Sequence, residues 1–296
     1  MLLRTMRIPI EVVAAVLATA TLIHAHFYTP LLFWPLTSLV LSAIALAAHS
    51  PLAISRRMTF LAHAQGHNIL TAALAAAIPT VVFKQSLSSA MFYLFTLLFV
   101  VLLNFAVLTT ERLGYRKDVA TGIVMSFQLT TTIALLYVIR TLYATTLDPL
   151  ALITGEYVLI GFGDVLTQLP MLALALIFPL AYGIKYLYAA VDEQFTESLG
   201  IKTRRLDYLF LASMSLAVSA TVYTLGSLMP AVLLVLPGAI AARYSPKLTD
   251  QIPLAISIAV LASAVAHLLY TALPWLWPSA ALGLVMLALL LAKRYK

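Results

Sequence analysis

Two histidines stand four residues apart in the otherwise apolar stretch "FLAHAQGHNIL", residues 60–70. His63 and His67 would lie on one face of a helix, because residues i and i+4 are neighbours on its surface. Two neutral imidazoles at this spacing can bind one metal ion. They suit zinc, copper, iron or nickel, whereas manganese prefers carboxylate oxygen. We therefore treat His63 and His67 as candidate metal ligands.

The elements that carry these side chains are predicted to be membrane helices. Of the 296 residues, 62% are hydrophobic and only 10% are charged, and the mean hydropathy is +1.01. About a quarter of the residues of an ordinary soluble domain are charged. The composition predicts an all-α, polytopic membrane helix bundle that forms a single domain over residues 1–296. The sequence contains no cysteine, so disulfides and thiolate metal sites are excluded.

Polar residues divide the apolar sequence into about ten spans, each near the length of about 20 residues that a membrane helix needs. The predicted spans are residues 8–27, 31–50, 59–83, 88–109, 119–143, 167–189, 206–225, 226–242, 252–272 and 276–292. The segment 148–166 is less regular, because glycines and the acidic residues Glu156 and Asp164 interrupt it. We expect a short or partial helix there, at the outer side of the membrane.

The basic residues predict how the spans are oriented. If the N-terminus is inside, all but Lys84 and Arg140 of the 18 Lys and Arg residues fall on the inner side. Cytoplasmic loops of membrane proteins carry such an excess of positive charge. We therefore predict a multi-pass plasma-membrane protein with both termini in the cytoplasm. The net charge of +7 follows from this topology and does not indicate nucleic-acid binding.

The longest polar stretch, "AVDEQFTESLGIKTRRL", covers residues 190–206. Its acidic residues precede its basic ones, which suits a helix dipole, and Gly200 suits a helix C-terminal cap. We predict a short cytoplasmic helix over residues 190–200, with its apolar side chains on one face. Such a helix could dock on a cytoplasmic partner, whereas the alternative is a solvated loop. The predicted docking residues are Asp192, Glu193, Phe195 and Leu199.

Other polar side chains are expected to complete the surroundings of the two histidines. A membrane histidine can also serve only as a hydrogen-bonding residue between helices. Ionisable residues at this depth are costly, however, and commonly mark a transport pathway. The candidates for further pathway residues are Gln65, Ser126, Gln128, Thr130–Thr132 and Asp164.

Five segments between about residues 55 and 245 resemble, in order, the metal-ion ABC permeases, the family that imports zinc, manganese or iron. The segments are "RRMTFLAHAQGH", "DVATGIVMSFQLTTTIALLY", "GFGDVLTQLP", "DEQFTESLGIKTRRLDYLFL" and "GSLMPAVLLVLPGAIAARYS". The fourth is similar to the family's coupling-helix region. Residues 1–50 fit the family less well, and we expect them to include an extra N-terminal span.

The resemblance also bears on the metal site. In the family, an Asp and a His four residues apart on the helix after Arg-Arg-Met bind the metal within the membrane. Aligned without gaps, these positions are His63 and His67, whereas a gap of four residues would place the family His on His63. In the gapless alignment a second imidazole replaces the carboxylate, which favours zinc over manganese.

The resemblance implies the permease subunit of an ATP-driven importer of divalent transition metal ions, zinc being favoured and manganese or iron possible. It implies an ATPase subunit docked on residues 190–200, an extracytoplasmic metal-binding protein and a permease homodimer. It implies no enzyme activity in the chain itself and no permanently bound cofactor. The sequence accordingly lacks a Gly-Lys-Ser/Thr phosphate loop and a His-Glu-x-x-His motif. The alternative is a stand-alone secondary metal carrier or a membrane-embedded metalloenzyme without an ATPase partner.

Overall fold

The computed structural model describes residues 9–83, 89–142, 154–227 and 229–292, and every regular element in these residues is helical. The first half contains α1 (Ile10–Tyr28), η1 (Pro30–Leu32), α2 (Phe33–Ser55), α3 (Thr59–Phe83), α4 (Ser89–Arg112) and α5 (Lys117–Leu142). The second half contains η2 (Tyr157–Leu159), α7 (Phe162–Val191), α8 (Glu193–Ser198), α9 (Thr203–Ala220), α10 (Val222–Leu225), α11 (Met229–Leu233), α12 (Leu236–Tyr244), α13 (Leu248–Ala272) and α14 (Pro278–Ala292). The predicted all-α class is confirmed.

Six of the described helices are long and apolar enough to cross a membrane, namely α1, α2, α4, α5, α7 and α13. Helix α3 has 25 residues, which is sufficient length to cross a membrane, and it contains the polar residues between His63 and Asn68. The segment Met229–Tyr244 and α14 are shorter apolar helices. A polytopic membrane protein is therefore confirmed, whereas the predicted number of about ten spans is not.

Two of the predicted spans are interrupted. The span at 206–225 ends as α9 at Ala220, and a separate turn of helix, α10, follows. The span at 226–242 is divided into α11 and α12. Gly226 ends α10 with a φ of 67°, a left-handed conformation that favours glycine. Pro237 lies in the first turn of α12, where its missing N–H costs nothing.

The predicted irregular segment at 148–166 also differs from the structure. Its described part contains the single 3-10 turn η2, and α7 begins at Phe162, five residues before the predicted span at 167–189. Asp164 is therefore part of a long membrane helix. Residues 148–153 lie outside the described residues.

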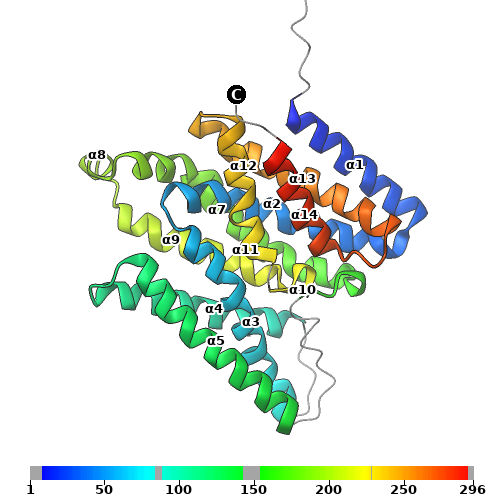
Figure 1. Cartoon of the computed structure of the whole chain (residues 1–296), viewed down its shortest axis with the longest axis horizontal. Helices are drawn as coiled ribbons and strands as arrows, with labels where there is room; N and C mark the ends of the chain where they lie inside the picture. The colour runs from blue at the N-terminus through cyan, green and yellow to red at the C-terminus, as the bar shows by residue number, and fades with distance from the viewer. Residues whose placement is uncertain (1–8, 84–88, 143–153, 228, 293–296) are drawn as a thin grey trace, which may run out of the picture.

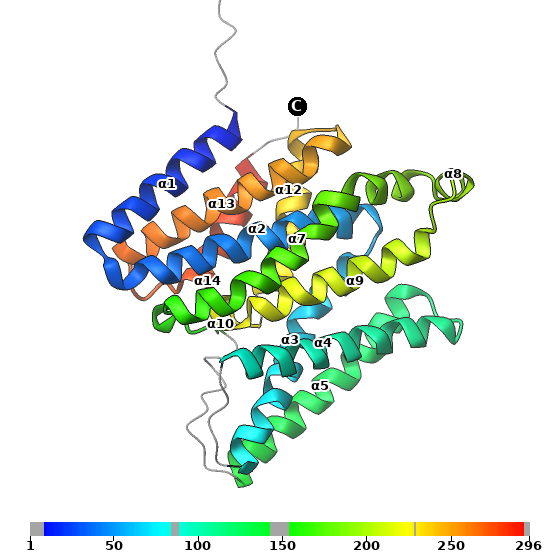
Figure 2. The ribbon, with the colours of Figure 1, turned by 180° about the vertical axis from the view of Figure 1, so that it is seen from behind.

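Helix α2 lies at the centre of the bundle, packed against α7, α12 and α13, and α1 covers the outer side of α13 (Figures 1 and 2). Small side chains in α2 and α13 are fully buried, which permits the close backbone approach typical of membrane helices. They include Ser42, Ala43, Ala45, Ala47, Ala48, Ala255, Ala259, Ala262, Ser263 and Ala266.

The crossing of α12 and α2 requires a glycine. A Cβ at Gly238 would lie 2.7 Å from the backbone nitrogen of Pro51, which no side chain can accommodate. The Gly238 N–H, in the first turn of α12, donates to Ser50 Oγ of α2 at 2.8 Å. This bond satisfies a backbone donor that has no partner within its own helix.

Helices α3, α4 and α5 form a separate lobe beside this bundle, and we call it the α3–α5 lobe (Figures 1 and 2). It is joined to the bundle mainly through α4, which packs on α9, and through α3, which packs on α11. The helix that carries the two histidines thus belongs to the lobe, whereas α8 and α9 belong to the bundle.

Candidate functional site

The two histidines of α3 lie side by side, as their spacing predicted. The ring centroids of His63 and His67 are 6.2 Å apart and the rings are inclined at 74°. His63 is exposed and His67 is half-buried, so the pair lies on the outer face of the α3–α5 lobe. This arrangement leaves both imidazoles accessible to an ion or to another chain.

Gln65 points away from the histidines, because residues two apart lie on different faces of a helix. Its Nε2 atom donates to Asn104 Oδ1 of α4 at 2.9 Å, and Asn68 Nδ2 donates to the same oxygen at 3.1 Å. Asn104 in turn donates to Ser215 Oγ of α9 at 2.6 Å. This buried polar network holds α3 against α4 and α9. The sequence analysis missed Asn104, although an asparagine inside an apolar span is itself a signal of interhelical hydrogen bonding.

Only some of the predicted residues of α5 face α3. Thr71 of α3 donates to the backbone oxygen of Gln128 at 3.3 Å and lies 2.7 Å from Thr132 Oγ1. The side-chain oxygen of Gln128 is buried and has no hydrogen-bond partner among the described residues. Ser126 and Thr130 are exposed, and their hydroxyls donate to carbonyls of their own helix. The structure thus places Gln128 near α3 and turns Ser126 and Thr130 outward.

Asp164 occupies the first turn of α7, where its Oδ2 atom accepts a hydrogen bond from the Gly161 N–H at 3.0 Å. A carboxylate in this place stabilises the N-terminus of a helix. Helix α7 packs mainly on α2 and α9, so the structure does not bring Asp164 to the histidines of α3. Among the residues that the structure describes, no group of three or more His, Asp or Glu could hold a metal ion.

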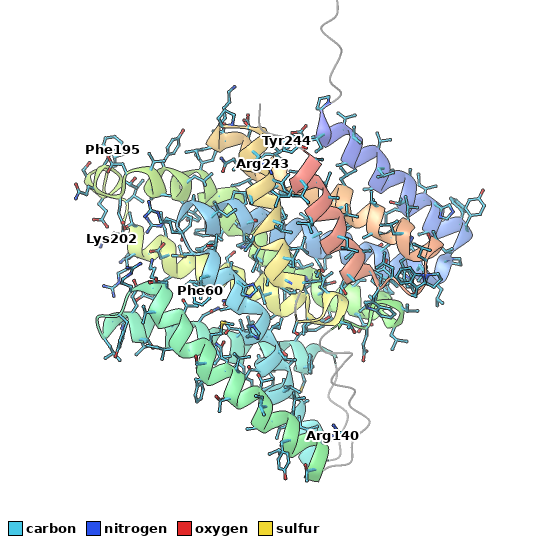
Figure 3. All side chains as sticks on the ribbon, in the orientation of Figure 1. Phe60, Arg140, Phe195, Lys202, Arg243 and Tyr244 are labelled. Atoms are coloured by element: carbon cyan, nitrogen blue, oxygen red, sulfur yellow. The ribbon has the colours of Figure 1, made fainter. Side chains whose placement is uncertain are left out.

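The predicted cytoplasmic helix is present as α8, Glu193–Ser198, which is shorter than the predicted 190–200. Asp192 caps it, since the Phe195 N–H donates to Asp192 Oδ1 at 2.8 Å. Phe195 and Leu199 are 60% and 63% exposed. With the end of α7 and with Ile201 they line a groove of about 360 Å³ whose lining is mostly apolar. Figure 3 shows Phe195 at the outermost tip of this end of the molecule.

Glu193, another of the predicted docking residues, does not line this groove. Its Oε1 atom pairs with Arg56 Nη2 at 3.3 Å, and Arg56 also pairs with Asp207 at 3.0 Å. Burial opposes the charge of Arg56, but the hydrogen bond and ion pair with Asp207 outweigh it and raise the pKa of Arg56 above its usual range. Sequence spacing could not reveal these contacts, because Arg56 lies 137 residues from Glu193 and 151 residues from Asp207.

Sequence comparison matches residues 29–293 to the model of the ABC 3 transport family. The chain belongs to this family. The match begins directly after α1, so the extra N-terminal helix lies outside it. The expected membership of the metal-ion ABC permeases is thereby confirmed. The chain is a multi-pass membrane subunit that forms the translocation pathway of an ABC transporter, and a partner subunit hydrolyses the ATP. A search of curated protein sequences found no match.

Two solved structures share the fold. PsaBC from Streptococcus pneumoniae, in complex with a Fab, is 17% identical with a TM-score of 0.74, and the alignment covers 93% of this chain and 94% of that one. A structure described as an inward-facing conformation of a metal-chelate type ABC transporter is 14% identical with a TM-score of 0.69. The alignment covers 96% of this chain and 99% of that one. At these identities the similarity shows the fold alone.

Proposed function

We propose that the chain is the permease subunit of an ATP-driven importer of divalent transition metal ions, with zinc favoured and manganese or iron as alternatives. The observation that supports a metal ion as the substrate is the pair His63 and His67, which lie on one accessible face of α3 with ring centroids 6.2 Å apart. Imidazole nitrogen suits zinc. Membership of the ABC 3 transport family supports the transport mechanism.

The two histidines supply two ligands of a transient site within the membrane. Protein-bound zinc prefers four ligands, so the remaining positions are open to water, to Gln128 or to groups from another chain. We propose that two copies of the permease form the pathway, since His63 is exposed on the outer face of the α3–α5 lobe. Alternating access then moves the ion past α3.

The α8 end of the molecule is proposed to face the cytoplasm and to dock an ATPase subunit. A capped short helix with an exposed phenylalanine and leucine beside an apolar groove supports this role. Exposed aromatic side chains that fill a partner's pocket dominate binding energy in many interfaces. An extracytoplasmic metal-binding protein is proposed to deliver the ion at the opposite end.

The competing functions are a stand-alone carrier and a membrane metalloenzyme. Neither requires a helix such as α8 for docking an ATPase. Proteoliposomes that contain the permease with its ATPase subunit distinguish these functions through uptake of radioactive zinc. We expect uptake that requires ATP hydrolysis by the partner. ATP-independent uptake by the permease alone would instead establish a secondary carrier.

A further inference from the structure

A cluster of charges joins five elements at the α8 end of the molecule. Asp207 of α9 accepts hydrogen bonds from Arg56, which directly follows α2, at 3.0 Å and from Tyr186 of α7 at 2.8 Å. Lys117, the first residue of α5, approaches the same carboxylate at 3.4 Å. Arg56 also holds Glu193 of α8 at 3.3 Å. We call these five side chains the Asp207 cluster.

The cluster borders a cavity of about 540 Å³ between α8 and α9 on one side and the α3–α5 lobe on the other. At this end of the described structure, two side-chain contacts cross from the lobe to α9, in addition to the buried bond of Asn104 with Ser215. Lys117 of α5 meets Asp207, and Arg112 of α4 donates to the Tyr208 hydroxyl at 2.6 Å. The lobe and the bundle are thus separated at this end by an open space with both charged and apolar lining, and these contacts connect them across it.

The strength of the contacts within the cluster is uneven. The side chains of Arg56 and Asp207 are 9% and 14% exposed, and Arg56 donates to both carboxylate oxygens. A buried, multiply bonded pair of this kind is strongly destabilising to break. The side chain of Lys117 is 40% exposed and makes a longer contact. Exposed pairs contribute little and form and break readily.

The position of Arg56 connects α8 to α3. Arg56 lies three residues before Thr59, where α3 begins. The turn between them is constrained, since Arg57 has a φ of 55° and the Met58 N–H donates to the Ala53 carbonyl at 2.8 Å. A left-handed conformation is uncommon for a residue other than glycine and is held by its surroundings. Arg56 thus contacts Glu193 of α8 and lies beside the start of the helix that carries His63.

We propose that Asp207 is a positioning residue that links the docking helix α8 to the α3–α5 lobe, and that its contact with Lys117 opens and closes once in each transport cycle. The inference rests on the proposed function. The buried Arg56–Asp207 pair remains intact, and α8 reaches it through the contact of Arg56 with Glu193, whose side chain is 54% exposed. The weaker Lys117 contact fixes the lobe in one of its two positions relative to α9.

The first test uses the complete complex of permease and ATPase in proteoliposomes, with Lys117→Gln and Asp207→Asn variants. We expect the ATPase to co-purify as with wild type, and zinc uptake per ATP hydrolysed to fall by about fivefold or more. Lys202→Gln is the matched control, because Lys202 is an exposed lysine at the same end (Figure 3) but lies outside the cluster. We expect its uptake per ATP to equal that of wild type.

Wild-type uptake per ATP in Lys117→Gln would overturn the proposal, and so would loss of the ATPase from that variant, since Lys117 lies outside the docking surface. Lys117→Gln gives this answer even if Asp207→Asn does not fold, because Lys117 is partly exposed. The proposed function itself fails in a different way, through the absence of ATP-dependent metal uptake in the wild-type complex.

A second test asks whether the cavity closes and opens. The chain contains no cysteine, so Asp118→Cys on α5 and Arg204→Cys on α9, which line the cavity from opposite sides, can be joined by a bismaleimide with a reducible spacer. We expect the unlinked double variant to transport, the linked one to lose about 90% of uptake while retaining its ATPase, and reduction to restore transport. Undiminished uptake by the linked protein would overturn the opening and closing of this contact.

Discussion

At the scale of the residue, helix geometry fixes which side chains of α3 act together. The spacing of His63 and His67 predicted that they share a face, and the structure confirms it. The same rule separates Gln65, which the sequence analysis grouped with them although it lies two residues from each. Interactions between distant segments, such as Glu193 with Arg56, could not be predicted, because no local rule relates residues 137 positions apart.

The identity of the residue at position 63 is predicted to set the preference between metals. We expect His63→Asp to retain transport and to shift the preference from zinc toward manganese, because a carboxylate oxygen replaces an imidazole nitrogen. Competition between the two metals for uptake in proteoliposomes measures this shift. His24→Asp is the control, since His24 is an exposed histidine on α1, outside the family match. An unchanged preference in His63→Asp would mean that this side chain does not bind the ion.

At the scale of the element, α8 illustrates what local signals predict well. Early acids and a following glycine predicted a short helix. In the structure it starts at Glu193, where Asp192 caps it, and ends at Ser198, two residues before Gly200. The breaks after Ala220 and before α12 were missed, although Gly226 and Pro237 lie beside them, because the sequence analysis divided the chain only by its apolar stretches. The fold class followed from composition, whereas helix ends inside the membrane did not.

Truncation of Phe195 is predicted to weaken the binding of the ATPase. Phe195→Ala should cost about 2 kcal/mol of binding free energy, or roughly 30-fold in Kd, if the ring fills a pocket of the partner. Titration of detergent-solubilised permease with the ATPase measures the Kd. Leu31→Ala, at a side chain that is also exposed (72%) but lies in η1, at the start of α2, should bind as wild type does. Equal affinity for both variants would refute the docking role of α8.

The glycine at the crossing of α12 and α2 is predicted to be essential for packing. In Gly238→Ala the added Cβ would lie 2.7 Å from backbone atoms of α2, which must shift. We expect the free energy of unfolding to fall by about 1–3 kcal/mol, the usual cost of overpacking. Gly163→Ala is the control, because a Cβ there has no atom within 4 Å. Thermal unfolding in detergent compares the two variants, and equal midpoints would contradict the tight crossing.

At the scale of the whole molecule, charge segregation in the sequence and the arrangement of helix ends agree. The ends of α2 and α7 and the starts of α5 and α9 meet at the Asp207 cluster, and the basic loops between them lie there. Arg140, one of the two basic residues that the prediction left outside this group, lies at the far end of α5 (Figure 3). Successive spans cross the membrane in opposite directions, and the helix ends that carry basic residues therefore meet at one end of the molecule.

The orientation of the bundle in the membrane is predicted from its basic loops and can be tested by cysteine labelling. We expect cysteines introduced at Tyr115 or Ser245 to be inaccessible to an impermeant maleimide added to intact cells, because their loops carry basic residues and face the cytoplasm. A cysteine at Trp275, 78% exposed between α13 and α14, should react. Permeabilised cells provide the control, in which all three cysteines should be labelled. The reverse pattern in intact cells would contradict the proposed topology.

The central claim is that His63 and His67 bind a metal ion which the molecule then transports at the expense of ATP in a partner subunit. The most direct test is radioactive zinc uptake by proteoliposomes containing the ATPase and either the wild-type permease, His63→Ala or His67→Ala. Alanine retains the helix. We predict ATP-dependent uptake by wild type and at least a tenfold lower rate for each variant, with the ATPase still bound. Wild-type rates of zinc and manganese uptake in both alanine variants would show that the histidines are packing residues and would contradict the account.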